Sequence, residues 1–420
     1  MKQNNNKPEL RFLGNTDEWE QRKFKLVFDF LQNNNLSRSE LNNDGEVMNV
    51  HYGDILVKYG AVLDVLRDEL TYLIDSSIAK KYQASLLRNG DVIIADAAED
   101  ETVGKCSEIS GLSDEIVLSG LHTIPCRPTM KFAEGYLGYH MNSSAYHDQL
   151  LPLIQGTKIS SISKAAIQDT RIFYPKSEEE QERIGTYFKN IDHLINLYQS
   201  KFDKLINVKK SMLEKMFPRK GCGVPEVRFL GFTDSWEQCK LGDYIIEYNE
   251  VTIVNNQYPA LTSSRKGIFL QTEYFAGNQI ASDDNTGYNI VPYGYFTYRH
   301  MSDDEIFYFN INDIVENGIV STLYPVFTTN EKLDSRYLQY QLNYGHEFAR
   351  FAVLQKQGGS RTYMYLSKLK QLSLTIPQSI DEQKKISDFF MELDHLITLY
   401  QRKREKLINI KKACMDKMFV

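Results

Sequence analysis

Apolar residues recur every seven positions in two long stretches of the chain. In the first stretch, one register contains Ile184, Ile191, Tyr198, Leu205 and Met212. A second register contains Tyr187, Leu194 and Val208. In the second stretch, one register contains Ile386, Leu393, Tyr400, Leu407 and Cys414, and the other contains Phe389, Leu396 and Ile410. A seam sustained over about four heptads predicts two long helices packed as a coiled coil.

Both helices are predicted to open with a capping box. Ser177 precedes Glu180 by three residues, and Ser379 precedes Glu382 by the same spacing. In such a box the serine hydroxyl accepts a hydrogen bond from the third backbone N–H, and the glutamate reaches back to the serine N–H. Pro218 and the glycines after it end the first helix.

Two pairs of segments repeat along the chain. Residues 8–21 (PELRFLGNTDEWEQ) return as 225–238 (PEVRFLGFTDSWEQ), an offset of 217, and each copy contains one of the only two tryptophans. Residues 174–217 match 376–419 at an offset of 202, with 23 of 44 positions identical. Such identity indicates a tandem duplication.

The duplicated helices have a simple predicted arrangement, in which their two seams pack against each other antiparallel. The alternative is that each helix lies on its own globular domain. Asp192-His193 and Asp394-His395 resemble catalytic pairs, but they lie beside apolar seam positions with no nucleophile nearby in sequence. We therefore expect them to serve structure or subunit contact.

Between the repeated segments the two halves share no convincing identity, over residues 25–173 and 242–375. Both inserts are predicted to be mixed α/β, with strands over Asp54–Tyr59, Asp91–Ala95, Gly294–Arg299 and Ile306–Phe309. Both end alike, in a glycine-containing polar loop, a short helix and an extended run into the long helix. The fold class is thus α+β: two globular mixed α/β domains separated by two long antiparallel coiled-coil helices, in a pseudo-two-fold tandem repeat. The predicted domains are 1–175, 176–220, 221–377 and 378–420.

The polar loops carry the candidate binding residues, because glycine lets the backbone approach a phosphate while hydroxyls, amides and cations supply donors. The candidates for DNA contact in the first insert are Lys58, Tyr59, Gln155, Thr157, Lys158 and Ser160. Those in the second are Arg265, Lys266, Tyr298, Arg299, Lys356, Gln357, Gly358, Gly359, Ser360, Arg361 and Thr362. The alternative is that the loops are ordinary surface turns.

Composition changes this picture in two ways. The formal net charge of −6 argues mildly against a nucleic-acid partner, yet residues 355–370 hold four cations and no acidic residue. A chain with 42% apolar and 25% charged residues is typical of globular proteins. Without a long apolar run or a signal peptide, we expect a cytoplasmic location. The five scattered cysteines predict neither a disulfide framework nor a zinc site.

Catalytic motifs are missing from the sequence. Adjacent prolines, a Walker-type loop, G-x-S-x-G and H-E-x-x-H do not occur. Residues 91–105 are acidic enough to suggest a metal-dependent nuclease, but they lack the D/E-x-K element. We therefore expect a chain without catalytic residues, a metal or a cofactor of its own.

The duplicated PE(L/V)RF…WEQ segments and the twin EQ…DHLI…LYQ…KK…KMF helices resemble the specificity (HsdS) subunits of type I restriction-modification enzymes. The resemblance implies that each insert reads one half of a split double-stranded DNA site and that the helices set the spacing. It also implies partners: two methyltransferase (HsdM-type) subunits that bring S-adenosylmethionine, and two motor-nuclease (HsdR-type) subunits that use ATP and Mg²⁺. The alternatives are a non-DNA coiled-coil scaffold carrying two ligand-binding modules, and the specificity subunit of a related restriction system.

Overall fold

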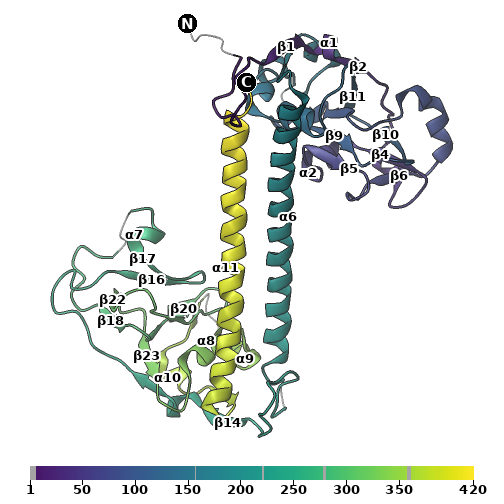
Figure 1. Cartoon of the computed structure of the whole chain (residues 1–420). Coiled ribbons are helices and arrows are strands. Elements are labelled where there is room, and N and C mark those ends of the chain that lie inside the picture. Colours follow the sequence, from purple (N-terminus) through teal and green to yellow (C-terminus); the bar gives the residue numbers. More distant parts are fainter. Residues whose placement is uncertain (1–5, 157, 220–221, 278–280, 357–360) are drawn as a thin grey trace. The chain divides into compact units, whose positions relative to one another are not determined.

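The computed structural model describes residues 6–156, 158–219, 222–277, 281–356 and 361–420 (Figure 1). The chain forms two compact units. Unit 1 consists of Met1–Gln199 with Gln401–Val420, and unit 2 of Ser200–Tyr400. Each unit therefore contains one insert and a part of both long helices. No helix in the described ranges is long and apolar enough to cross a membrane.

Unit 1 is built around two mixed sheets. The strand order of the first is β2 (Phe28–Phe30), β11 (Thr123–Pro128), β7 (Val92–Ala95), β9 (Cys106–Ser110) and β5 (Val62–Asp64). The second has the order β10 (Ile116–Ser119), β4 (Val47–Val50), β6 (Thr71–Leu73) and β3 (Leu41–Asn42). All four residues of the central strand β7 are buried, which explains its continuous apolar run. The predicted strand at 91–95 is thus confirmed.

Short elements complete unit 1. The strands are β1 (Glu20–Lys23), β8 (Ala97–Ala98), β12 (Ser160–Ser161) and β13 (Arg171–Tyr174). The helices are α1 (Phe24–Val27), α2 (Tyr52–Val57), α3 (Tyr136–Met141), α4 (Ser144–His147) and α5 (Lys164–Ile167), with 3-10 turns η1 (Arg38–Glu40), η2 (Ser76–Ser85) and η3 (Leu151–Leu153).

The predicted strand at 54–59 was wrong, because this segment forms the helix α2. The His51 side chain caps the helix by accepting a hydrogen bond from the Gly53 backbone N–H at 3.2 Å. Ile55 is buried and Val57 is exposed. A short apolar run fits one helical turn as well as a strand, and here tertiary packing decided the outcome.

Unit 2 contains a four-stranded sheet with the order β15 (Ile245–Glu247), β23 (Val326–Thr329), β19 (Phe296–Thr297) and β21 (Asn310–Ile311). Its strand pairs are β14 (Glu237–Lys240) with β25 (Ser373–Ile376), β16 (Leu261–Ser264) with β17 (Gly267–Leu270), β18 (Asn289–Pro292) with β22 (Asn317–Val320), and β20 (Met301–Ser302) with β24 (Thr362–Tyr363). The helices are η4 (Leu241–Asp243), α7 (Gln271–Tyr274), α8 (Ser335–Tyr344), α9 (His346–Leu354) and α10 (Leu366–Leu369).

Two strand predictions in unit 2 need correction. The strand predicted at 294–299 shrinks to β19, Phe296–Thr297. The one predicted at 306–309 is irregular chain that leads into β21. The Phe309 backbone N–H there donates to the Asn343 side chain at 2.8 Å instead of to a neighbouring strand. Phe307 and Phe309 of this segment are buried, and Tyr308 is half-buried, without forming a ladder.

The two long helices are confirmed as α6 (Glu178–Lys215) and α11 (Ile380–Lys417). Ser177 Oγ accepts a hydrogen bond from the Glu180 N–H at 3.3 Å, and Ser379 Oγ does the same for the Glu382 N–H at 3.4 Å. Only this half of each predicted capping box is present. Both glutamate side chains point instead to arginines far away in the sequence.

Those arginines belong to the repeated segments 8–21 and 225–238, which we call the lead segments. Arg11 binds Glu180 through two hydrogen bonds of 2.6 and 2.8 Å, and Arg228 binds Glu382 at the same two distances. Both carboxylates are almost completely buried. The ion pair therefore fixes each lead segment to the start of the long helix in its own unit.

Inside each unit the two long helices run antiparallel. In unit 1, Tyr187 lies 3.3 Å from Cys414 and Asp192 lies 2.6 Å from Lys411. A later residue of α6 therefore contacts an earlier residue of α11. In unit 2, Asp394 pairs with Lys209 at 2.5 Å and Lys201 lies over the Tyr400 ring. The predicted antiparallel packing is confirmed within each unit.

The end of one long helix closes the core beside each lead segment. In unit 1 the Leu10 N–H donates to the Lys417 carbonyl at 2.9 Å, and Trp19 packs edge-on against Phe419. In unit 2 the Val227 N–H donates to the Lys215 carbonyl at 3.0 Å. The repeated KMF sequence is thus a core element, because its methionine and phenylalanine are buried in both units.

Candidate nucleic-acid interface

Both inserts end with the same succession of elements. In unit 1, β12, α5 and β13 precede α6; in unit 2, β24, α10 and β25 precede α11. Each later element starts 202 residues after its counterpart, the offset of the long helices. β12 pairs with β8, and β24 pairs with β20. The prediction that both inserts end alike is confirmed, and the equivalence extends into the divergent sequence.

The candidate loop of unit 1 lies at the start of β12. Gln155 is exposed and its backbone pairs with Ser161 through hydrogen bonds of 2.9 and 2.8 Å. Gly156 has a φ of 104°, and a Cβ there would lie 2.0 Å from the Ile159 carbonyl, so this turn requires glycine. Lys158 is exposed and Ser160 is half-buried. Thr157 lies outside the described residues.

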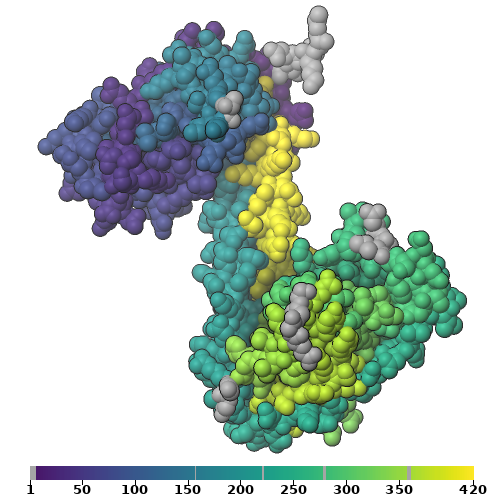
Figure 2. All heavy atoms as spheres, turned by 180° about the vertical axis from the view of Figure 1, so that it is seen from behind, coloured from purple at the N-terminus to yellow at the C-terminus, as the bar shows by residue number. Residues whose placement is uncertain are grey.

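The candidate loop of unit 2 precedes β24. Lys356 and Arg361 are exposed, whereas Thr362 is buried. Gln357, Gly358, Gly359 and Ser360 lie outside the described residues. Figure 2 views unit 2 from the side on which residues around 340–370, coloured yellow-green, form much of the surface.

Arg265 and Lys266 form the two-residue tip of the β16–β17 hairpin, in which Ser264 pairs with Gly267. Both cations are exposed there. With Arg299, Arg265 also lines a polar pocket of about 270 Å³. The hairpin tip and the Lys356–Arg361 loop thus present four exposed cations from separate parts of the sequence.

Besides the buried Thr362, two predicted contact residues belong to the core. Tyr59 is 3% exposed and its hydroxyl donates to the Glu69 carbonyl at 3.2 Å. Tyr298 is fully buried and its hydroxyl donates to the Met364 carbonyl at 2.8 Å. Burial raises the pKa of both phenols far above the usual range. These two residues are therefore removed from the candidate set, since neither ring reaches the surface. Their neighbours Lys58 and Arg299 are exposed.

A pair of surface tyrosines beside the second loop was not predicted from the sequence. Tyr363 and Tyr365 are exposed, and their rings stack at 5.9 Å with an interplanar angle of 12°. Residues 361–366 alternate strictly between exposed and buried. This period of two was readable from the apolar residues at 364 and 366, and it would have placed both tyrosines on the outer face with Arg361.

The acidic partners of three candidate cations were also not predicted from the sequence. Arg361 pairs with Asp303 at 3.0 Å, Arg265 with Asp304, and Lys356 with Glu305. The stretch 355–370 looked basic because its own sequence holds no acid. The three carboxylates come from a turn about fifty residues earlier.

A second feature of each unit is a pocket lined by the long helices, of about 870 Å³ in unit 1 and 500 Å³ in unit 2. One long helix contributes five residues to each pocket, and the two sets are equivalent at the offset of 202. Those of unit 1 are Ile408, Lys411, Lys412, Met415 and Asp416. Those of unit 2 are Ile206, Lys209, Lys210, Leu213 and Glu214.

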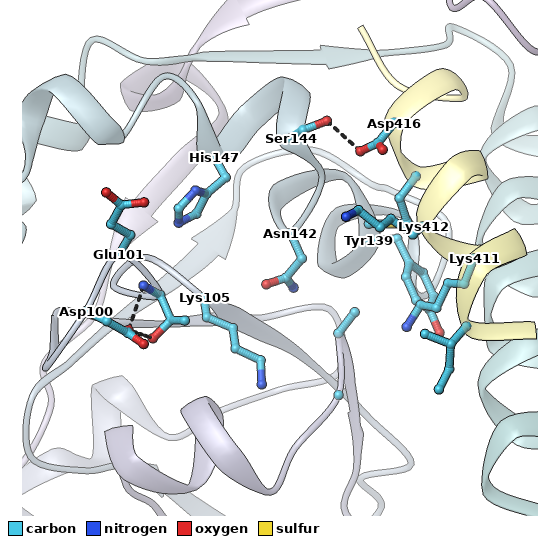
Figure 3. A pocket seen from close by; sticks show the side chains of 15 residues that line it. Asp100, Glu101, Lys105, Tyr139, Asn142, Ser144, His147, Lys411, Lys412 and Asp416 are labelled. Carbon is cyan, nitrogen blue, oxygen red and sulfur yellow. Dashed lines mark hydrogen bonds between the residues drawn. The ribbon is translucent and has the colours of Figure 1, made fainter. Parts of the chain in front are cut away.

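The facing walls of these pockets come from the inserts and differ. In unit 1 the insert contributes Lys105, Asn142 and His147 opposite the α11 residues (Figure 3). In unit 2 it contributes Tyr344 and His346. The helical wall is thus duplicated, while the insert wall is specific to each unit.

The aspartates of the two Asp-His pairs have structural partners; Asp394 lines the unit 2 pocket, and Asp192 binds two residues that line the unit 1 pocket. Asp192 accepts hydrogen bonds from Tyr139 at 2.8 Å and Lys411 at 2.8 Å. Asp394 accepts from Tyr340 at 2.7 Å and Lys209 at 2.5 Å. Each aspartate therefore ties an insert to both long helices of its unit, which supports the structural reading of the pairs.

The acidic region at 91–105 is built into the fold. Asp91 is buried and binds Arg127 through bonds of 2.9 and 2.7 Å, and Lys105 Nζ donates to the Leu56 carbonyl at 2.8 Å. Within the described ranges no group of three or more His, Cys, Asp or Glu residues could hold a metal ion. The nuclease alternative gains no support from these contacts.

Comparison with known proteins places the chain in a family. The model of the type I restriction modification DNA specificity domain matches residues 16–207 and 234–409. A Methanocaldococcus jannaschii protein named as the MjaX type I restriction enzyme specificity subunit is 22% identical over 428 aligned residues, covering 95% of this chain and 92% of the relative. The S subunit of a Type-I restriction-modification system from M. genitalium has the same fold, with a TM-score of 0.60, 12% identity and 99% coverage of both chains.

The two family matches cover most of the chain, one in each half, and both include the duplicated helices. The lead segments, the loops and the recurring terminal elements of the inserts fall within or directly beside them. The chain therefore belongs to the type I restriction-modification DNA specificity family and is a specificity subunit with two such domains.

Proposed function

We propose that the chain binds double-stranded DNA at a bipartite site and that each insert reads one half of it. The observation that carries this proposal is the unequal divergence of the two units. Their helices, lead segments and terminal insert elements are equivalent, while the remaining insert sequences are unrelated. Inserts that recognised the same ligand would have no reason to become unrelated while the helices and lead segments around them stayed alike. Inserts that recognise different ligands would.

In this proposal contacts to phosphates supply affinity, and contacts to base edges supply sequence specificity. Arg265, Lys266, Arg299, Lys356 and Arg361 are the exposed cations of unit 2 suited to phosphates or to guanine edges. In unit 1 the candidates are the exposed Gln155 and Lys158, which precede β12. The stacked Tyr363 and Tyr365 add flat apolar faces next to these donors.

The chain is proposed to direct chemistry without performing it. Two methyltransferase subunits would bring S-adenosylmethionine and methylate adenines flipped out of the duplex. Two motor-nuclease subunits would use ATP and Mg²⁺ to restrict unmodified DNA. Because the substrate is cellular DNA, the site of action is the cytoplasm.

The duplicated helical walls of the two pockets support two copies of one partner. A partner that recognises the five equivalent side chains would find them once in each unit. The half-exposed apolar residues of the helices, such as Leu194 and Ile410, provide further surface for it. We therefore place the methyltransferase subunits on these walls.

An exchange of inserts tests the proposal. Residues 25–173 are replaced by the insert of another family member, and the chain is expressed with its methyltransferase partner in a host whose methylome is sequenced. We expect one half of the methylated site to change and the other half to stay. A change in both halves, or in neither, would contradict modular reading.

The scaffold alternative rests on a specific observation, since the net charge is −6 and three candidate cations are already paired with carboxylates. Binding to duplex DNA discriminates the two functions. DNA recognition predicts an affinity that falls steeply and linearly with salt on a double-logarithmic scale. A scaffold for other ligands predicts no such binding.

A further inference from the structure

A single acidic turn in unit 2 holds three of the cations that the DNA-binding proposal uses. Asp303, Asp304 and Glu305 follow β20 directly. Asp303 pairs with Arg361 at 3.0 Å, while Asp304 pairs with Arg265 at the hairpin tip and Glu305 pairs with Lys356. The formal charges of these six residues cancel.

Strand pairing places this turn. Ser302 pairs with Thr362 across the antiparallel β20–β24 ladder, so Asp303, which follows Ser302, lies opposite Arg361, which precedes Thr362. Ser302 Oγ donates to Asp304 at 2.8 Å and fixes the carboxylate between the hydroxyl and Arg265. The pKa of Asp304 is lowered by the hydrogen bonds from Arg265 and Ser302, so this group stays ionised.

The backbone of the turn is strained. Glu305 has a φ of 60°, in the left-handed region that a residue with a Cβ rarely adopts. Strain of this kind persists only where the surrounding structure maintains it, and it concentrates at functional sites. Here it aims the Glu305 carboxylate at Lys356.

Unit 1 carries an acidic triplet at the equivalent strand end, although the insert sequences show no similarity there. β8 pairs with β12 as β20 pairs with β24, and Glu99, Asp100 and Glu101 follow β8 directly. All three are exposed. The two inserts therefore carry an acidic triplet at the same position beside their candidate loops, although the sequences around the triplets are unrelated.

All three pairs in unit 2 are solvent-accessible, with between 23% and 71% of each side chain exposed. Exposed ion pairs are individually weak, so a correctly placed phosphate can replace a carboxylate. A duplex that does not fit the module cannot replace all three at once and meets three negative charges instead. The three ion pairs thus weaken the binding of any duplex whose phosphates do not match the positions of the three cations.

We propose that Asp303, Asp304 and Glu305 are specificity-determining residues that occupy Arg265, Lys356 and Arg361 as an internal substitute for phosphates and so suppress sequence-independent binding to DNA. This inference rests on the proposed DNA-binding function. It assigns the acidic turn a part in discrimination between sites, and not in catalysis or metal binding.

The test measures how the full-length chain binds a fluorescent duplex of random sequence across a series of salt concentrations. The variant D303N/D304N/E305Q removes three charges from the turn. The matched control D283N/D313N/E331Q removes three charges from other exposed positions of unit 2, including the Asp313 partner of Arg336. Circular dichroism verifies the fold of each variant, and the single variants D303N and E305Q replace the triple variant if its spectrum differs.

We expect the turn variant to bind the random duplex about 10-fold more tightly than the wild type, with a steeper dependence on salt. The control variant should stay within about 2-fold of the wild type, the range of ordinary surface changes. Equal binding by wild type and turn variant, or an equal gain in the control, would overturn the inference while DNA binding itself stands. If wild type and variants all fail to bind any duplex at low salt, the proposed function and the inference fall together.

Discussion

Arg11 donates two hydrogen bonds to Glu180, of 2.6 Å from Nε and 2.8 Å from Nη2, although 169 residues separate them. The pair recurs as Arg228 and Glu382, where Trp236 adds a third donor at 3.3 Å. In both units a buried glutamate at the start of a long helix therefore fixes the preceding lead segment. The contact explains why these residues are among those repeated in the sequence.

Removal of the arginine should destabilise its unit strongly. Arg228→Met leaves the Glu382 carboxylate buried without its partner, which costs about 3–5 kcal/mol. Urea unfolding of the full-length chain measures the loss. Arg22→Met is the matched control, because its pair with Glu20 is partly exposed and is worth at most about 1 kcal/mol. A loss no larger than the control's would contradict a structural role for the pair.

Stability of unit 1 should depend on Glu108. Burial raises the pKa of this carboxyl to about 7, against the lowering effect of hydrogen bonds from the Gly138 and Gly135 N–H groups. A folded pKa above the unfolded value of 4.5 means that the folded state binds the proton more tightly. Its contribution is complete below pH 4.5 and is lost as the pH rises through 7, by about 3 kcal/mol in total.

Thermal unfolding between pH 5 and 8 checks this sign. Glu108→Gln should remove that part of the pH dependence, since the amide does not titrate, while Glu46→Gln on the surface should keep it. An unchanged slope in the Glu108 variant would show that the carboxyl is not protonated in the fold.

The duplicated pockets predict that the two partner sites can be lost one at a time. Ile206→Asp and Ile408→Asp each place a charge on an exposed apolar residue of one helical wall. Each variant should retain one methyltransferase subunit instead of two, and the double variant should retain none. Mass measurement of the complexes by light scattering reports the stoichiometry.

The neighbouring residues provide the control for this experiment. Asn207→Asp and Asn409→Asp introduce the same charge next to each isoleucine on the exposed helix surface. These variants should still bind two copies. Loss of both copies from one single substitution would indicate a shared site rather than two equivalent ones.

The adjacent residues Tyr298 and Arg299 should separate stability from DNA binding. Arg299→Ala removes an exposed cation, which should weaken duplex binding and lower the salt slope by about 1. Tyr298→Phe removes the buried hydrogen bond to Met364, which should cost about 1 kcal/mol of stability and leave the salt slope unchanged. If Tyr298→Phe lowered the salt slope and Arg299→Ala left it unchanged, Tyr298 would belong to the DNA interface after all.

The sequence predicted the frame well because the frame is repetitive. The heptads, the helix starts and the 23 identities in 44 positions all predict α6 and α11. The heptads and helix starts depend on residues close in sequence, and the identities occur because the segment is duplicated. The second half of the capping box was predicted wrongly for a physical reason. Glu180 has the correct spacing to Ser177, but an arginine from another segment offers a stronger, charge-assisted partner.

The inserts were harder to predict because their contacts are formed at long range. The run at 54–59 suits a strand in isolation and becomes α2 through packing. Arg361 and Lys356 looked free because Asp303 and Glu305 lie more than fifty residues away. Tyr298 and Arg299 are neighbours with opposite burial, which only the position of β19 decides.

Both units contain the same hydrogen bond, from a lead segment to the last lysine of a long helix, but the two partners are close in sequence in unit 2 alone. In unit 2 residues 218–224 link the helix to the lead segment, whereas in unit 1 the paired residues Leu10 and Lys417 are 407 positions apart in the sequence. The order of elements is therefore cyclic. A circularly permuted gene would start within residues 218–224 and join residue 420 to residue 1 through a copy of this connector. Its product should form the same set of contacts, with unit 2's insert preceding unit 1's insert in the sequence.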